Sequence, residues 1–174
     1  MLTALAIIAV VVIAVLIAAA LRSNDFRVER TAVIKASPEK IYPLINDMHQ
    51  FNTWNPFVKM DPAIKGSYSG AESGRGAAYA WESSKVGTGR MEIVDTQAPR
   101  KVIMSLQFLK PFAGNNTAEF TLDPQSDTTA VTWAMYGKSA YIPKLMGLFF
   151  SQDKMIGGSF ESGLASLKAS AEAR

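Results

Sequence analysis

Hydrophobic residues form two patterns along this chain, and the first is an unbroken apolar run from Leu2 to Leu21. Thr3 is the one polar residue of this run, and the others are Leu, Ile, Val and Ala. As a helix rising about 1.5 Å per residue, the run is long enough to span the ~30 Å hydrocarbon core of a bilayer. We therefore predict that residues 1–22 form an N-terminal transmembrane anchor and that residues 23–174 form one domain.

A cleaved signal peptide is the alternative interpretation of the same run. The three alanines at 18–20 would suit a signal peptidase. However, no Lys or Arg precedes the run, and it exceeds the ~7–15 apolar residues usual in a signal peptide. Arg22, Arg27 and Arg30 follow it, so the positive-inside bias predicts a single-pass membrane protein with a cytoplasmic domain. A domain on the periplasmic or secreted side remains the alternative.

The second pattern is an alternation of apolar and polar residues in short segments after the anchor, which predicts strands. Turn signals separate these segments, and the gaps are too short for helical crossovers, so neighbouring strands should be antiparallel. A Gly- and Ser-rich stretch at residues 66–76 predicts a loop. The predicted strands cover residues 26–35, 58–64 (an edge strand interrupted by Pro62), 77–83, 89–96, 100–109, 116–123 and 128–138.

Helical signals lie on both sides of this series of strands. Ser37 and Pro38 begin a short helix over residues 38–45, and a second short helical turn follows at 49–54. We predict a separate apolar helical turn at residues 143–150. A long helix begins at Ser151, and its apolar residues recur at three- and four-residue steps: Ile156, Phe160, Leu164, Leu167 and Ala171.

This order of elements predicts an α+β fold. A curved antiparallel sheet of about seven strands wraps around the long C-terminal helix, and two short helices follow the first strand. Such a sheet has a concave face that one helix covers only in part. The uncovered part is where we expect a ligand to bind.

Five short segments, taken together, resemble one known family. They are Ala36-Ser37-Pro38-Glu39-Lys40-Ile41-Tyr42, Phe51-Asn52-Thr53-Trp54-Asn55-Pro56-Phe57, Gly87-Thr88-Gly89-Arg90-Met91-Glu92-Ile93, Thr129-Ala130-Val131-Thr132-Trp133 and Phe160-Glu161-Ser162-Gly163-Leu164-Ala165-Ser166-Leu167-Lys168. In this order and spacing, residues 26–172 are similar to the START-like superfamily, also called SRPBCC, in its polyketide cyclase/dehydrase branch. The resemblance implies the helix-grip fold. It leaves the chemistry open, because the family includes cyclases, lipid carriers, hormone binders and co-chaperones on one scaffold.

Composition and charge argue against several classes of function. The net charge is +3, and no run of Lys or Arg interleaved with aromatic residues predicts nucleic-acid binding. His49 is the one histidine and there is no cysteine, so nucleophilic triads and metal sites of the usual ligand types are not expected. The glycines of residues 70–76 open a strand and not a helix, unlike a phosphate-binding loop. We expect neither a cofactor nor a metal.

Aromatic residues and methionines are the candidates for lining a ligand cavity, although core packing would explain most of them. Glu82 and Arg90 are candidates for a polar anchor within the cavity. The alternative is that they face outward and pair across strands, since Met91 and Ile93 better supply the apolar face. The candidate lining residues are Trp54, Tyr79, Trp81, Met91, Met104, Phe108, Phe120, Trp133, Met135, Met155 and Phe160.

Three functions agree with these patterns. The first is a binding module that takes up a lipid or other hydrophobic small molecule beside the membrane. The second is a cyclase- or dehydratase-type enzyme, for which Glu82 and Arg90, and more distantly Tyr136, would have to supply the acid/base chemistry. The third is a protein-interaction module, which an exposed apolar patch would favour. The abundance of apolar lining over convergent ionisable groups favours the first.

Overall fold

The computed structural model describes residues 2–21, 23–139, 141–148 and 152–173. The expected helix start at Ser151 lies outside these residues. The helices are α1 (Leu2–Leu21), α2 (Pro38–Asn46), α3 (Met48–Trp54), α4 (Pro56–Met60), α5 (Tyr141–Met146) and α6 (Gln152–Glu172). The strands are β1 (Asp25–Ile34), β2 (Lys65–Ser69), β3 (Ala78–Ser83), β4 (Gly87–Gln97), β5 (Lys101–Lys110), β6 (Gly114–Gln125) and β7 (Thr128–Lys138).

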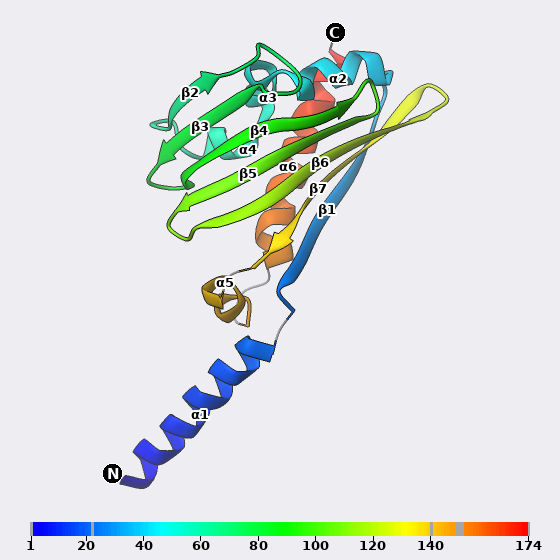
Figure 1. Cartoon of the computed structure of the whole chain (residues 1–174). Coiled ribbons are helices and arrows are strands. Elements are labelled where there is room, and N and C mark those ends of the chain that lie inside the picture. Colours follow the sequence, from blue (N-terminus) through cyan, green and yellow to red (C-terminus); the bar gives the residue numbers. More distant parts are fainter. Residues whose placement is uncertain (1, 22, 140, 149–151, 174) are drawn as a thin grey trace.

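The strands form one seven-stranded antiparallel sheet in the order β1-β7-β6-β5-β4-β3-β2. Strands β2 to β7 follow one another as hairpins, while β1 pairs with the last strand, β7. The sheet curves around α6, α2 lies near the upper end of β1, and α3 and α4 lie behind β3 and β4 in this view (Figure 1). The predicted α+β helix-grip architecture is therefore confirmed, including the short helices after β1 and the apolar N-terminal helix.

The edge of the sheet differs from the prediction. Residues 58–64 were expected to form a strand, but residues 56–60 form α4, because Pro56 starts a helical turn and the Asn55 side chain accepts a hydrogen bond from the Phe57 N–H at 3.1 Å. The strand at this edge is β2, of which all but Lys65 falls in the segment expected to be a loop. Every residue of β2 is exposed, so its sequence lacks the apolar alternation by which a strand is predicted.

The core lies between the concave face of the sheet and one face of α6. Phe160, Leu164 and Leu167 of α6 are each at most 2% exposed. Gly163 lets the helix approach closely, since a Cβ atom there would lie 2.7 Å from the Trp133 ring. The apolar stripe predicted for this helix is thus buried against the sheet.

Replacement Leu164→Ala should lower the free energy of unfolding by about 2–5 kcal/mol, because it removes buried methyl groups and leaves a cavity. Thermal unfolding of the full-length chain in detergent would measure this loss. The matched control is Leu109→Ala, an exposed leucine whose truncation should change stability by no more than about 0.5 kcal/mol. Equal melting temperatures for the two variants would contradict the packing described.

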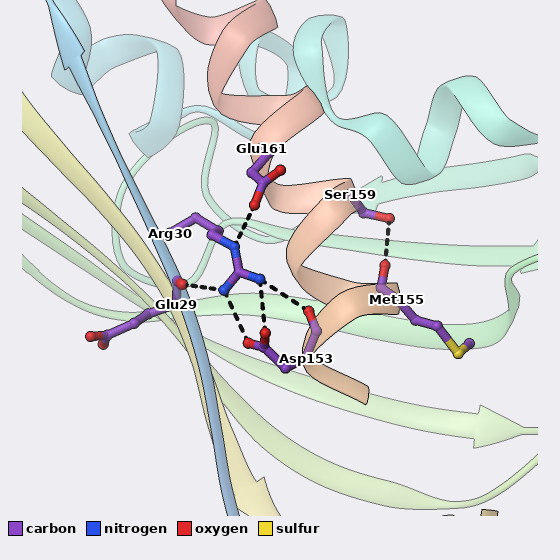
Figure 2. A network of polar contacts seen from close by, with 6 residues as sticks. All are labelled: Glu29, Arg30, Asp153, Met155, Ser159 and Glu161. Carbon is purple, nitrogen blue, oxygen red and sulfur yellow. Dashed lines mark hydrogen bonds and ion pairs between the residues drawn. The ribbon is translucent and has the colours of Figure 1, made fainter. Parts of the chain in front are cut away.

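A polar network fixes the first turns of α6 to β1 (Figure 2). Arg30 on β1 donates from Nε to Glu161 at 2.6 Å and from both terminal nitrogens to the Asp153 carboxylate at 3.0 Å. Arg30 also donates to the main-chain oxygens of Glu29 and Asp153. Gly157 makes room for this guanidinium, because a Cβ atom there would overlap it. The network therefore positions the part of α6 that carries Ile156 and Phe160.

The contribution of this network should depend on pH. Hydrogen bonding to Arg30 lowers the pKa of the Asp153 carboxyl below its ordinary value. A depressed carboxyl pKa stabilises the fold at pH above the unfolded value of about 3.9, and this stabilisation disappears as pH falls through the lower folded value. We expect the coupling between Arg30→Met and Asp153→Asn, measured by a double-mutant cycle, to be present at neutral pH and to vanish in acid. A coupling that is constant across this range would contradict the assignment.

Candidate functional site

A cavity of about 460 Å³ lies between the concave face of the sheet and the N-terminal half of α6. This volume falls within the ~300–1,000 Å³ of small-molecule sites in proteins. Strands β3 to β7 supply one wall, α3 and α4 supply another, and Ile156 and Phe160 of α6 lie across it. The aromatic and methionine residues of the lining are Phe26, Phe51, Phe57, Tyr79, Trp81, Met91, Met104, Phe108, Phe112, Trp133, Met135, Met155 and Phe160.

Period-two alternation explains how the strands build this wall. On β6, Ala118 lies between Met104 of β5 and Met135 of β7 in the register of the sheet, and all three line the cavity. Ala118 is the smallest of the three, so it leaves space between two flexible neighbours. Trp133 of β7 stacks on Phe160 of α6 with ring centroids 4.0 Å apart. Both rings line the cavity.

Most of the residues predicted to line a cavity do lie on it. These are Tyr79, Trp81, Met91, Met104, Phe108, Trp133, Met135, Met155 and Phe160. Trp54 and Phe120 are instead fully buried in the core outside the lining. The indole N–H of Trp54 donates to the main-chain oxygen of Leu44 at 2.8 Å, so this side chain connects α3 to α2.

Glu82 and Arg90, the candidates for a polar anchor, do not line the cavity. Met91 and its neighbours at period two face inward, so Arg90 and Glu92 face outward, where they form an ion pair at 2.6 Å. Glu82 is exposed and lies opposite Lys65 of the edge strand. The structure thus places both side chains outside the cavity, as in the alternative, although Arg90 pairs with Glu92 along its own strand and not across strands.

Tyr136 also lies outside the lining. Its hydroxyl donates to Glu119 at 3.1 Å, and burial with this contact raises the pKa of the phenol. Tyr136 therefore stays protonated at neutral pH and does not meet Glu82 or Arg90 at the cavity. The three residues considered for acid/base chemistry do not converge on one place.

Several lining residues were missed by sequence reasoning. Phe51 and Phe57 come from α3 and α4, and the sequence does not show where such short helices lie over a sheet. Asn55 and Asn116 add polar atoms, and the Asn55 amide is engaged by Phe57 and Asn52. Phe26 could have been found, because it is an apolar residue of the alternation that predicted β1.

The chemistry of the lining is apolar. Among the described residues that line the cavity there is no Asp, Glu or His, and the charged ones are Lys110 and Lys138. Burial raises the pKa of Tyr79, so its hydroxyl remains protonated at neutral pH. Within the described part of the chain, no three His, Cys, Asp or Glu residues are grouped to hold a metal. The arrangement can enclose an apolar molecule, and it brings no acid and base together.

Comparison with known sequences identifies the domain. Residues 25–172 match the family model described as polyketide cyclase / dehydrase and lipid transport. The chain belongs to this family. The family, part of the SRPBCC group, therefore accounts for the chain from the start of β1 to the end of α6. No curated protein sequence matches the chain.

Solved structures share the fold of this polyketide cyclase/dehydrase and lipid transport domain at low sequence identity. Protein CV1439 from Chromobacterium violaceum is 16% identical with a TM-score of 0.60, over 86% of this chain and 97% of that one. The Aha1 dimer from Colwellia psychrerythraea is 17% identical with a TM-score of 0.57, over 84% and 96%. Ara h 8.0201 is 9% identical with a TM-score of 0.59, over 86% and 99%. At such identities these relatives show the fold and not the activity.

The family match begins after α1, which needs its own description. Among the described residues, Thr3–Leu21 is the one helix long and apolar enough to cross a membrane. Most of its side chains are exposed, so it is not a core helix of the domain. A membrane anchor and a signal sequence both meet these criteria.

Proposed function

We propose that this chain is a membrane-anchored member of its family that binds a lipid or other hydrophobic small molecule in the cavity between sheet and α6. The observation that carries the proposal is the character of the cavity, which has the volume of a ligand site and a lining of aromatic and methionine side chains. Methionines adapt their shape to different apolar ligands, so such a lining suits flexible chains or rings.

Burial of apolar surface is the main source of affinity in such a site. Each 100 Å² of apolar surface that a ligand buries gains roughly 2.5 kcal/mol, before the entropic cost of association is subtracted. Low-micromolar binding needs about 7.5 kcal/mol after that cost, so the proposal favours a large apolar ligand. The absence of Asp, Glu and His from the described lining supports binding over acid/base catalysis.

Titration of the full-length chain in detergent with an environment-sensitive fluorescent fatty acid tests the binding proposal. We expect saturable enhancement of fluorescence that unlabelled lipids reverse by competition. An enhancement that rises linearly with probe, as in detergent alone, would contradict it. Removing the charge in Glu82→Gln should leave the affinity unchanged, because this residue lies outside the cavity.

The anchoring role of α1 gives a separate prediction. Its exposed Leu, Ile and Val side chains would be stable in hydrocarbon, and we expect the full-length chain to stay in the membrane fraction after alkaline washing. Replacement Val10→Arg places a charge at the middle of the span at a cost of about 2.5–3.5 kcal/mol and should release part of the chain. A wild-type chain that is released by the wash, or that has lost its first residues, would contradict anchoring.

A further inference from the structure

The cavity opens at the end of the domain from which α1 leaves. Phe112, in the β5–β6 turn, and Met155, in the first turns of α6, both line the cavity, and they are 43% and 65% exposed. The β5–β6 turn, α5 and the start of α6 lie at the same end of the molecule as α1 (Figure 1). The opening and the proposed anchor are therefore on one side of the domain.

Exposed apolar residues gather at this end of the domain. We call them the apolar rim, and they are Phe112, Ile142, Met146, Leu148 and Met155, of which Phe112 and Met155 line the cavity. They come from the β5–β6 turn, the α5 region and α6, which are far apart in sequence but lie at the α1 end (Figure 1). An isolated exposed apolar residue is ordinary, but a group at the open end of a cavity marks a surface for an apolar partner.

Contacts between α1 and α5 fix the height of the rim relative to the membrane. The two helices pack together, and Ala19 in the last turn of α1 is fully buried. Lys144 of α5 donates to the Asn24 side chain at 2.8 Å and to the main-chain oxygen of Ala20 at 3.4 Å. If α1 spans the bilayer, its last turn lies at the boundary between hydrocarbon and head groups, and α5 must lie there as well.

The charges beside the rim agree with a lipid surface. Lys110, Lys138 and Lys154 are exposed at the ends of β5 and β7 and in the first turns of α6. Two acidic residues lie near these lysines. Asp153, which precedes Lys154, is paired with Arg30, and Asp25 lies opposite Lys138 in the sheet. Amphipathic segments that mix apolar residues with lysine bind at the membrane interface, where lysine meets anionic head groups.

From this geometry we infer that the apolar rim seats in the head-group layer of the membrane that holds α1, so that the cavity opens directly onto lipid. A hydrophobic ligand then passes between the bilayer and the cavity without crossing water. The inference rests on the anchoring role proposed for α1. It adds the orientation of the domain and the source of the ligand.

The cysteine-free sequence allows a direct test, because one introduced cysteine can be labelled without background. The full-length chain would be reconstituted in vesicles of phosphatidylcholine and phosphatidylglycerol that contain nitroxide-labelled lipid. Single variants Phe112→Cys and Met146→Cys would each carry a fluorophore. The control is Val33→Cys, since Val33 is 48% exposed like the rim residues. It lies about 26 Å from Asp25, where β1 begins close to α1, at ~3.3 Å per residue.

We expect the nitroxide lipid to quench the labels at Phe112 and Met146 severalfold more than the label at Val33. Equal quenching at all three positions would overturn the inference. Flotation of the same vesicles then identifies what failed. If the chain floats with the vesicles, the proposal that α1 is an anchor stands and only the proposed orientation of the domain is wrong. If the chain does not float, the anchoring proposal is wrong as well.

Discussion

Replacement Ala118→Phe should weaken binding of a fluorescent fatty acid by about tenfold or more, equivalent to at least ~1.4 kcal/mol. Ala118 lies between Met104 and Met135 on the wall of the cavity, so an aromatic ring there occupies the space that a ligand would fill. Titration of the variant in detergent measures the loss. Because the new ring enters existing space, the fold should tolerate it better than overpacking of a filled core, which costs about 1–3 kcal/mol.

The neighbouring residue supplies the matched control. Thr117 is next to Ala118 on β6 and therefore faces the opposite side of the sheet, so Thr117→Phe adds a ring of the same size outside the cavity. It should leave affinity within about twofold of wild type, a change below ~0.5 kcal/mol. Equal loss of binding in both variants would show that the cavity is not the binding site, provided that both keep the wild-type circular dichroism spectrum.

Replacement Phe160→Ala should lower the free energy of unfolding by about 3–5 kcal/mol. Phe160 is 1% exposed and stacks on Trp133, so the change removes the main aromatic contact between α6 and the sheet. For a chain of this size, each kcal/mol shifts the melting temperature by ~2–4 °C, so we expect a decrease of roughly 6–20 °C. Thermal unfolding of the full-length chain in detergent measures it.

Phe112→Ala is the comparison for this second variant. Phe112 is a phenylalanine of the apolar rim, and its truncation should change stability by no more than about 0.5 kcal/mol. A melting temperature of the Phe160 variant that equals that of the Phe112 variant would mean that α6 is not held to the sheet by this stack.

The sequence predicted the strands and the long helix well where one face is buried. Residues 128–138 form β7 as expected, since β7 lies between β1 and β6 and its apolar residues face the core. The same reasoning failed at the edge. β2 is exposed throughout and carries no periodic signal. Residues 58–64 have a strand-like pattern, but the local cap by Asn55 favours the helix α4 in the first part of this segment.

The kinds of residue that line the candidate site were predictable, but the exact set of lining residues was not. Phe120 shares a face of β6 with Ala118, so alternation correctly turns both inward. Ala118 lines the cavity while Phe120 is covered, and this difference depends on the helices that pack over the sheet. The sequence of β6 alone does not predict it. Likewise, the outward direction of Arg90 follows from alternation with Met91, whereas the contribution of Phe57 depends on the unpredicted α4.

The most direct measurement of the central proposal is native mass spectrometry of the full-length chain extracted from membranes in mild detergent, followed by organic extraction of bound material. We expect the wild-type chain and the Thr117→Phe variant to carry an added apolar molecule that the Ala118→Phe variant lacks. A wild-type chain without any added mass, or an equal addition in all three proteins, would contradict the proposal that this cavity binds a hydrophobic ligand.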